Sequence, residues 1–180
     1  NGLLAVWPHA NDQGAWEMGL RPLPDLPAAL QAAKALYVAA SDPLGDDPAL
    51  AEALRALPFV VVQDLFLTAT ARLANVVLPA LPFTERDGSF TSGERRVQRY
   101  YPAVLARPDA RPDYAISSEI CKRAGVEAEI SSAAGVFARL AEKVPAYQGL
   151  NYRMLAQTAE QWPIVGRPDV YYGGTAYENT

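Results

Sequence analysis

Three short apolar runs constrain the fold of this chain more than any other feature. They are ALYVAA at 35–40, FVVVQ at 59–63 and VVL at 76–78. Polar residues follow the first two runs directly, and Pro79 ends the third. A strand with one wet face alternates apolar and polar residues, whereas a strand buried on both faces is apolar throughout. Helical patterns separate the runs. The sequence therefore predicts an α/β fold in which a parallel sheet is covered on both faces.

Start and stop signals place the helices around these strands. In DDPALAEALRAL at 46–57, Asp47 is a typical N-cap, Pro48 suits the first helical position, and Pro58 ends the pattern. Further helices are predicted at 27–34, 68–74, 113–124, 132–143 and near 152–161. The other predicted elements are a strand at 2–7, a loop at 8–27 and an irregular hairpin that pairs 89–91 with 95–99.

Composition and charge narrow the class of protein. The chain has 180 residues, half of them hydrophobic and a fifth charged, so it can bury one domain. We expect an α/β domain over 1–144 and, at 145–180, a helical or extended linker toward a further C-terminal region. The net charge of −4 argues against a general nucleic-acid binder. Apolar runs fall short of the roughly 20 residues that cross a membrane.

The lone cysteine and the lone histidine exclude several kinds of site. Cys121 by itself cannot form an internal disulfide or hold an iron–sulfur cluster, and it is expected to be a buried structural thiol. Because His9 is the only histidine, a mononuclear zinc site with three or four His or Cys ligands cannot form. The sequence also lacks a Ser-His-Asp pattern, a P-loop and a Gly-x-Gly-x-x-Gly motif.

Polar residues cluster where the predicted strands end. The clusters are NDQG at 11–14, SDP at 41–43 and QD at 63–64. Ligands of open parallel sheets bind beyond the carboxyl ends of the strands. Carboxylates there can accept hydrogen bonds from a guanine edge or a ribose, while turn amides meet phosphate oxygens. The alternative is plain strand-end turns, because Asp and Ser are ordinary turn residues.

The densest basic patch is ERRVQR at 94–99. Its arginines could clamp a phosphate or a partner carboxylate, since a guanidinium presents a planar fork of donors. The favoured interpretation is a solvated strand face whose arginines pair with Glu85, Asp87 or Glu94, because a run of charges usually faces water.

Two long ordered motifs resemble one family. They are VVQD-x-F-x-T-x-T-A-x-x-A-x-x-VLP at 61–79 and E-x-DG-x-F-T-x-x-ERRVQ at 85–98. ANDQGAWEMGLRP at 10–22 and RPDYAISSEICKRAG at 111–125 extend the match. Together they resemble the molybdopterin oxidoreductases. The resemblance implies a Rossmann-like, three-layer parallel sheet of the formate dehydrogenase and DMSO reductase type, with a small hairpin and a C-terminal helical extension.

The resemblance also implies a set of cofactor contacts. In molybdenum members the matching positions touch the guanine, ribose and phosphate portions of molybdopterin guanine dinucleotide. Arg86 stands where a lysine is common, which keeps the charge and changes the geometry of the contact. The matching positions in this chain are Gln63, Asp64, Asp42, Arg86 and Asp113.

Within the family, TSGERRVQRYYPA at 91–103 and the ending YYGGTAYENT resemble the large iron–sulfur subunit of NADH-quinone oxidoreductase, respiratory complex I. That likeness implies a mainly structural segment with a vestigial cofactor cleft, in a subunit that supports electron transfer from NADH to quinone. It implies no cofactor or metal in this segment and iron–sulfur clusters elsewhere in the subunit. The implied partners are other peripheral-arm subunits, and the implied location is the cytoplasmic side of the bacterial inner membrane.

Two other functions remain open at this point. The first is the α subunit of a molybdenum enzyme of the formate dehydrogenase type, in which the same residues hold bis-guanylyl molybdopterin. The second is a nucleotide-binding or interaction module without redox work. In each case we expect no catalytic residue within this segment.

Overall fold

The structure, a computed structural model, describes residues 6–128 and 132–156. The strand predicted at 2–7 lies mostly outside these residues, and Val6 and Trp7 are not part of a strand. The helix predicted near 152–161 begins as expected, since α8 spans Tyr152–Leu155, and its second half lies outside the described residues.

A parallel sheet forms the first half of the described chain. Its strands are β1 (Leu36–Ala39), β2 (Val60–Asp64) and β3 (Val76–Pro79), in the order β1-β2-β3. Both neighbouring pairs are parallel, with Leu36 opposite Val60 and Val61 opposite Val76. The three apolar runs are therefore the three strands, and the predicted parallel α/β arrangement is confirmed.

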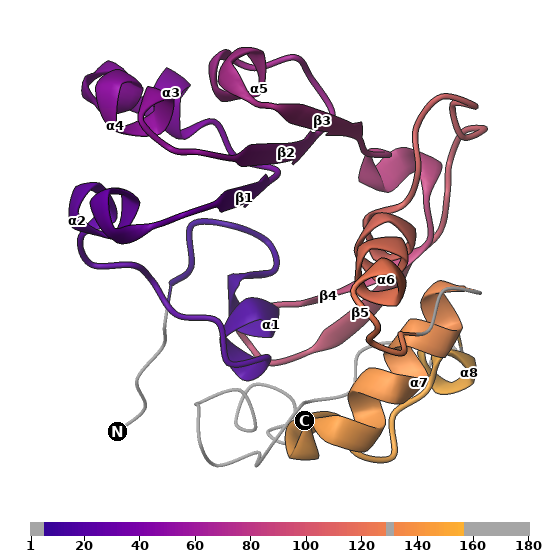
Figure 1. The fold of residues 1–180 in the computed structure, drawn as a ribbon. Coiled ribbons are helices and arrows are strands. Elements are labelled where there is room, and N and C mark those ends of the chain that lie inside the picture. The colour runs from indigo at the N-terminus through magenta and orange to yellow at the C-terminus, as the bar shows by residue number, and fades with distance from the viewer. Residues whose placement is uncertain (1–5, 129–131, 157–180) are drawn as a thin grey trace, which may run out of the picture.

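Helices cover one face of this sheet. They are α2 (Leu26–Ala32), α4 (Ala51–Arg55) and α5 (Ala69–Leu73), and Figure 1 places α4 and α5 on the side of the sheet away from the hairpin. The core that they enclose contains Leu30, Val38, Leu54, Val60, Val62 and Ala71. Such burial is the main favourable term in folding, at roughly 25 cal/mol per Å² of apolar surface.

The opposite face of the sheet differs from the prediction. On this face Val61 of the central strand is only partly buried and its register partner Tyr37 is 44% exposed, whereas Val62 on the other face is fully buried. Within the described residues the sheet is thus well covered on one face and partly open on the other. The apolar sequence of the strands anticipates two covered faces, whereas the second layer is incomplete in this segment.

Capping side chains start the helices where the sequence predicts. Asp47 accepts a hydrogen bond from the Ala49 amide at the start of η1 (Pro48–Leu50), which leads into α4. Ser132 accepts from the Gly135 amide at the start of α7 (Ala133–Lys143). Gly125, with φ of 78°, follows the end of α6 (Asp113–Arg123), as glycine commonly does after a helix.

Two short helices were not predicted. α1 (Asp12–Glu17) lies within the segment predicted to be a loop, and α3 (Pro43–Asp46) lies between the polar cluster at 41–43 and the helix predicted at 46–57. α1 is short, contains Gly14 and packs against β4, so tertiary contacts determine it more than helix propensity does.

The second half of the described chain has its own core. The hairpin pairs β4 (Gly88–Thr91) with β5 (Val97–Tyr100), as predicted, and a short turn, η2 (Phe83–Glu85), precedes it. The hairpin packs against α7, η3 (Pro145–Tyr147) and α8. Its core contains Val97, Phe137, Tyr147, Tyr152 and Leu155. The predicted division of the chain at residue 144 stays a prediction.

A short main-chain bridge brings α6 to the end of the sheet. The Arg111 amide donates to the Pro79 carbonyl at 3.1 Å, and the Leu81 amide donates to the Arg111 carbonyl at 3.0 Å. Since Arg111 precedes α6 by two residues, this bridge fixes the N-terminus of α6 beside the carboxyl end of β3.

Candidate functional site

The polar strand ends lie at one edge of the sheet, as the sequence predicts. The Ala40 amide, just past β1, donates to the Gln63 carbonyl at 2.9 Å, and the Ala80 amide donates to the Asp64 carbonyl at 3.0 Å. Ala40 has φ of 51°, in the left-handed region that is uncommon for a residue with a side chain, and it turns the chain sharply toward Asp42. The carboxyl ends of parallel strands form the edge at which such sheets bind ligands.

Gln63 is the buried centre of this edge. Its side chain is 3% exposed, and its Nε2 donates to Oδ1 of Asp113 at 2.5 Å. Its Oε1 accepts a hydrogen bond from the hydroxyl of Tyr37. Burial first, and then the nearby Asp113 carboxylate, raise the pKa of Tyr37 above its ordinary value of 10.0. The Gln63 amide is therefore held at both ends.

Arg86 completes this network from the other side of Asp113. Its Nη2 lies 2.8 Å from Oδ2 of Asp113, and its Nε donates to the Leu81 carbonyl at 3.1 Å. The ion pair is partly exposed, so solvent screens it. Arg86 thus orients the Asp113 carboxylate, which keeps further acceptor positions for a ligand.

Asp42 lies at the same edge and holds the start of α5. Its Oδ1 accepts from the Thr70 amide at 2.8 Å and from the Thr70 hydroxyl at 2.7 Å, and its Oδ2 accepts from the Ala69 amide at 3.3 Å. The hydrogen bond from the Thr70 hydroxyl is the main cause that lowers the pKa of Asp42 below its ordinary value of 3.8. Asp42 therefore remains ionised over the neutral range.

The side chain of Asp64 stabilises the turn that directly follows it. Its Oδ1 accepts from the amides of Leu65 and Phe66, at 2.6 and 3.2 Å. This is the local pattern by which an aspartate shapes the residues that follow it. Of the predicted site residues, Gln63, Arg86 and Asp113 are joined directly, while Asp42 and Asp64 build the adjoining loops.

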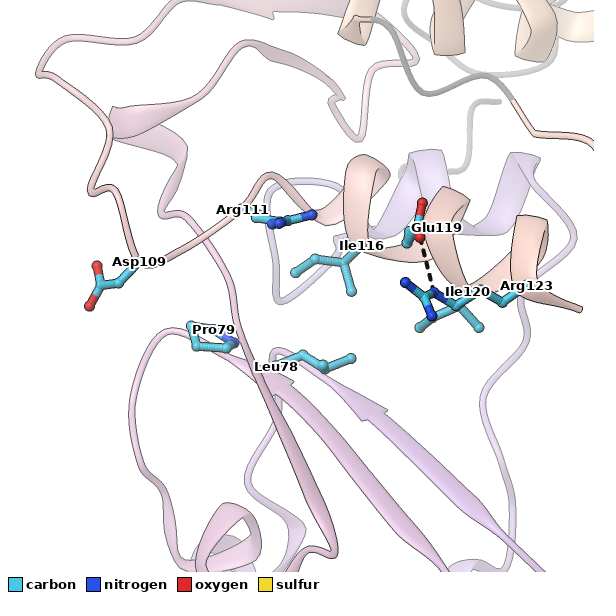
Figure 2. A pocket seen from close by; sticks show the side chains of 8 residues that line it. All are labelled: Leu78, Pro79, Asp109, Arg111, Ile116, Glu119, Ile120 and Arg123. Atoms are coloured by element: carbon cyan, nitrogen blue, oxygen red, sulfur yellow. Dashed lines mark hydrogen bonds and ion pairs between the residues drawn. The ribbon is translucent and has the colours of Figure 1, made fainter.

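A cavity of about 350 Å³ opens beside this network, between the end of β3 and α6 (Figure 2). Its apolar walls are Leu78, Pro79, Ile116 and Ile120. Leu78 is the register partner of Gln63, and Ile116 lies three residues after Asp113, on the same side of α6. The remaining lining residues are charged: Asp109, Arg111, Glu119 and Arg123.

Sequence reasoning missed two members of the edge, Tyr37 and Thr70. Tyr37 has the pattern of an apolar strand residue, although its place two residues before the end of β1 puts its hydroxyl within reach of Gln63 on the next strand. Thr70 has the pattern of an ordinary helix residue, yet it is 1% exposed and binds Asp42. It is a specified residue of the motif at 61–79, where it stands two residues after Thr68, which caps α5, and that is its signal in the sequence.

The arginine cluster departs from the favoured interpretation. Arg99 pairs with Asp87 at 2.8 Å, as proposed from the sequence, and Arg96 lies 3.7 Å from Glu94. Arg95, however, is 8% exposed and pairs with Glu17 at 2.8 Å. The expectation of a solvated face was wrong for Arg95 because α1, which was not predicted, brings a carboxylate over the hairpin.

The one cysteine and the one histidine of the chain were also considered as site residues, and they lie in different environments. Cys121 is partly exposed rather than buried as predicted, because it falls on a less covered side of α6. His9 is exposed and lies 3.1 Å from Asp12. In 6–128 and 132–156, no group of His, Cys, Asp and Glu could hold a metal ion. A membrane-spanning helix is likewise not found in that part of the chain.

Comparison with known proteins identifies the family to which this chain belongs. The family described as molybdopterin oxidoreductase matches residues 1–123, more than half of the chain. This chain belongs to the molybdopterin oxidoreductase family. The family resemblance seen in the motifs is therefore confirmed, and the description of the family names molybdopterin and oxidoreductases.

Several similar proteins are named as formate dehydrogenases. The chain is 41% identical over 152 residues to the alpha subunit of F420-dependent formate dehydrogenase 2 of Methanococcus maripaludis, a match that covers 82% of this chain and 22% of that protein. It is 40% identical to a protein of Bacillus subtilis that is provisionally named a formate dehydrogenase, over 68% of this chain and 13% of that protein. The chain thus spans about a fifth or less of these relatives.

A solved structure shares the fold. Acetylene hydratase from Pelobacter acetylenicus superposes with a TM-score of 0.59 at 23% identity, over 79% of this chain and 21% of that one. At this identity the likeness supports the α/β fold alone.

The assignment to the large iron–sulfur subunit of NADH-quinone oxidoreductase was wrong. The relatives at 39–41% identity are named as formate dehydrogenases, so the complex I function, with its vestigial cleft and its NADH and quinone chemistry, is overturned. The expected peripheral-arm partners and the location at the inner membrane depended on that assignment, and nothing in the structure tests them.

Proposed function

We propose that this chain is part of the alpha subunit of a molybdenum-dependent formate dehydrogenase, and that its sheet edge binds one nucleotide arm of molybdopterin guanine dinucleotide. The observation that carries the cofactor assignment is the joined set Gln63, Asp113 and Arg86 beside the cavity at the end of β3. Formate is the proposed substrate because several relatives are named as formate dehydrogenases.

The residues present fit a guanine nucleotide by their chemistry. Asp113 is paired with Arg86, so its carboxylate offers acceptors to the N–H groups of a guanine. Gln63 adds an amide whose orientation is already fixed. The apolar walls at Leu78 and Ile116 suit the faces of a flat ring. A site with apolar walls and few oriented polar groups is typical of cofactor binding.

The chemistry itself belongs to the bound group. A bound molybdenum cofactor would supply the two-electron redox chemistry for the oxidation of formate to carbon dioxide and a proton. The described residues of this chain bind and orient: Gln63 and Asp113 hold the nucleotide, and Arg86 holds Asp113. Asp42 supports the neighbouring loop through Thr70, which keeps the edge of the sheet in one conformation.

The test uses the full-length polypeptide. Molybdenum and guanine nucleotide, released by acid as GMP, are measured per polypeptide in the wild type and in Gln63→Leu and Asp113→Asn. We expect stoichiometric molybdenum and GMP in the wild type and a clear loss of both in the variants. Glu52→Gln, an exposed change on α4, is the matched control and should retain both.

Two results would overturn the proposal. A wild-type protein purified from molybdate-supplied cells with neither molybdenum nor GMP would reject the enzyme class. Full retention of GMP in both site variants would reject this edge as the nucleotide site. Formate oxidation by the wild type, followed with an artificial electron acceptor, checks the substrate independently.

A further inference from the structure

The outer edge of β1 is an open edge of the parallel sheet. Among the described strands, β1 pairs only with β2. The amides of Leu36 and Ala40 both donate to carbonyls in or next to β2. Because main-chain groups alternate in direction along a strand, the amides of Tyr37 and Ala39 point away from β2. β1 therefore presents a row of main-chain donors and acceptors that β2 does not use.

Apart from its short length, β1 lacks the features that protect a natural sheet edge. Such edges carry a charge, a proline or a bulge, or a helix or loop covers them. β1 reads LYVA, without charge or proline, and its register with β2 is continuous. Tyr37, Ala39 and Ala40 are exposed. An apolar strand of this kind is typical of the interior of a parallel sheet.

The other edge of the sheet, at β3, is partly closed. The Arg111 amide donates to the Pro79 carbonyl, and the Leu81 amide donates to the Arg111 carbonyl, at the end of that strand. The chain then continues into α6, where Ile116 is buried. The edge at β1 is therefore the more open of the two.

The uncovered face of the sheet adjoins this open edge. Tyr37 and its register partner Val61 lie on that face. The connecting helices α4 and α5 lie together on the other face (Figure 1), as expected for two right-handed crossovers that both run from β1 toward β3. A right-handed crossover in the opposite direction places its helix on the second face. One further strand beyond β1, with its crossover helix, would thus cover both the open edge and the open face.

The rest of the polypeptide can supply such a unit. The chain spans 22% and 13% of the length of the two relatives described above, so most of the length of each relative lies outside it. A second copy of the chain, paired edge to edge through β1, would close the edge and leave the face at Tyr37 and Val61 bare. A strand–helix unit of the same polypeptide covers both surfaces.

We propose that the sheet continues beyond β1 with a parallel apolar strand of the same polypeptide, supplied from outside residues 1–180, whose crossover helix packs over Tyr37 and Val61. The main-chain groups of Tyr37 and Ala39 bind this strand, as those of a central strand do. The inference does not depend on the proposed function, because the open edge needs a strand whether or not a nucleotide binds.

The first test is residue-resolved hydrogen exchange of the full-length protein, read by mass spectrometry with electron-transfer fragmentation. The amides of Leu36 and Val38, which face β2, are the internal reference. We expect the amides of Tyr37 and Ala39 to exchange within about tenfold of that reference, since all four would lie in one cooperative unit. Faster exchange of Tyr37 and Ala39 than this, with the reference protected, would overturn the proposal.

The second test identifies the strand that pairs with β1. A photo-reactive p-benzoylphenylalanine replaces Ala35, an exposed residue directly before β1, in the full-length protein. We expect an intramolecular cross-link to an apolar segment outside residues 1–180, located by peptide mass spectrometry. The same substitution at Arg55, exposed at the end of α4, is the matched control and should not yield that cross-linked peptide.

Two cross-linking results would also overturn the proposal. A covalent dimer on a denaturing gel would assign the edge to a second copy of the chain. A cross-link from position 35 to a segment within residues 1–180 would place the partner strand inside this chain. Molybdenum and GMP contents are measured separately, so either result leaves the proposed function standing.

Discussion

Nε2 of Gln63, in the central strand, donates a 2.5 Å hydrogen bond to Oδ1 of Asp113, the first residue of α6, across 50 residues of sequence. This contact joins the sheet to α6, which lies between the hairpin and α7 in the chain (Figure 1). Arg86 holds the other carboxylate oxygen, so Asp113 adds side-chain contacts to the main-chain bridge at Arg111 that fixes the N-terminus of α6.

Replacing Asp113 should therefore loosen α6. In Asp113→Asn the charge that Arg86 neutralises is lost, and one amide must replace two carboxylate oxygens. We expect a loss of about 1–2 kcal/mol, with screening by solvent keeping it low. Hydrogen exchange of the α6 amides is the measurement. The exposed Asp109→Asn is the control, and equal exchange in the two variants would contradict a role of Asp113 in docking the helix.

The same carboxylate should set the acidity of Tyr37. Burial is the larger cause of its raised pKa and the Asp113 charge the smaller, so Asp113→Asn should lower the pKa of Tyr37 part of the way toward 10.0. The sign follows from charge, since a nearby carboxylate disfavours the phenolate. NMR of ring-labelled tyrosine, with Tyr37→Phe to assign the signal, measures it. A pKa that stays or rises in Asp113→Asn would contradict the network.

Asp42 makes stability depend on pH in acid. Its pKa in the folded protein is below the ordinary value of 3.8, chiefly because of the Thr70 hydroxyl. The stabilisation is present above that ordinary value and is lost as pH falls through the lower, folded value. Thr70→Val removes the hydroxyl and keeps the shape. We expect its acid unfolding, followed by circular dichroism, to begin at higher pH than that of the wild type.

The sequence predicted the elements that carry a local signal, such as an apolar run or a capping residue. β2 and its neighbours are apolar runs, and α7 starts at a serine that caps it. α1 escaped prediction because its stability comes from contacts with residues far away in the chain, such as the hydrogen bond from the Thr91 amide to Oδ1 of Asn11. Missing α1 also led to the wrong environment for Arg95.

The wrong assignment to complex I also has a structural reason. The hairpin motif that suggested complex I, TSGERRVQRYYPA at 91–103, contains residues with structural roles. Arg95 pairs with Glu17, Val97 is fully buried, and Arg99 pairs with Asp87. Contacts of this kind report the fold that family members share. They do not report the reaction, so the sequence identified the family correctly and its activity wrongly.

Gly45 should be intolerant of a side chain for a reason tied to Asp42. A Cβ built on Gly45 overlaps with Oδ2 of the Asp42 carboxylate. Gly45→Ala must therefore displace that carboxylate and weaken its hydrogen bonds to Ala69 and Thr70. We expect the variant to resemble Thr70→Val in acid unfolding. Additive effects in the double variant would contradict a shared cause, because changes acting on one contact do not add.

The second core depends on one buried polar pair. The hydroxyls of Thr91 and Tyr147 lie 2.6 Å apart, at residues that are 3% and 2% exposed. Tyr147→Phe leaves the Thr91 hydroxyl buried without this partner, which should cost about 1–2 kcal/mol in denaturant unfolding. Adding Thr91→Val removes the stranded hydroxyl and should restore part of the loss, since an apolar pair of similar shape is nearly neutral. If the second change instead lowers stability by its full single-variant cost, the two hydroxyls do not interact.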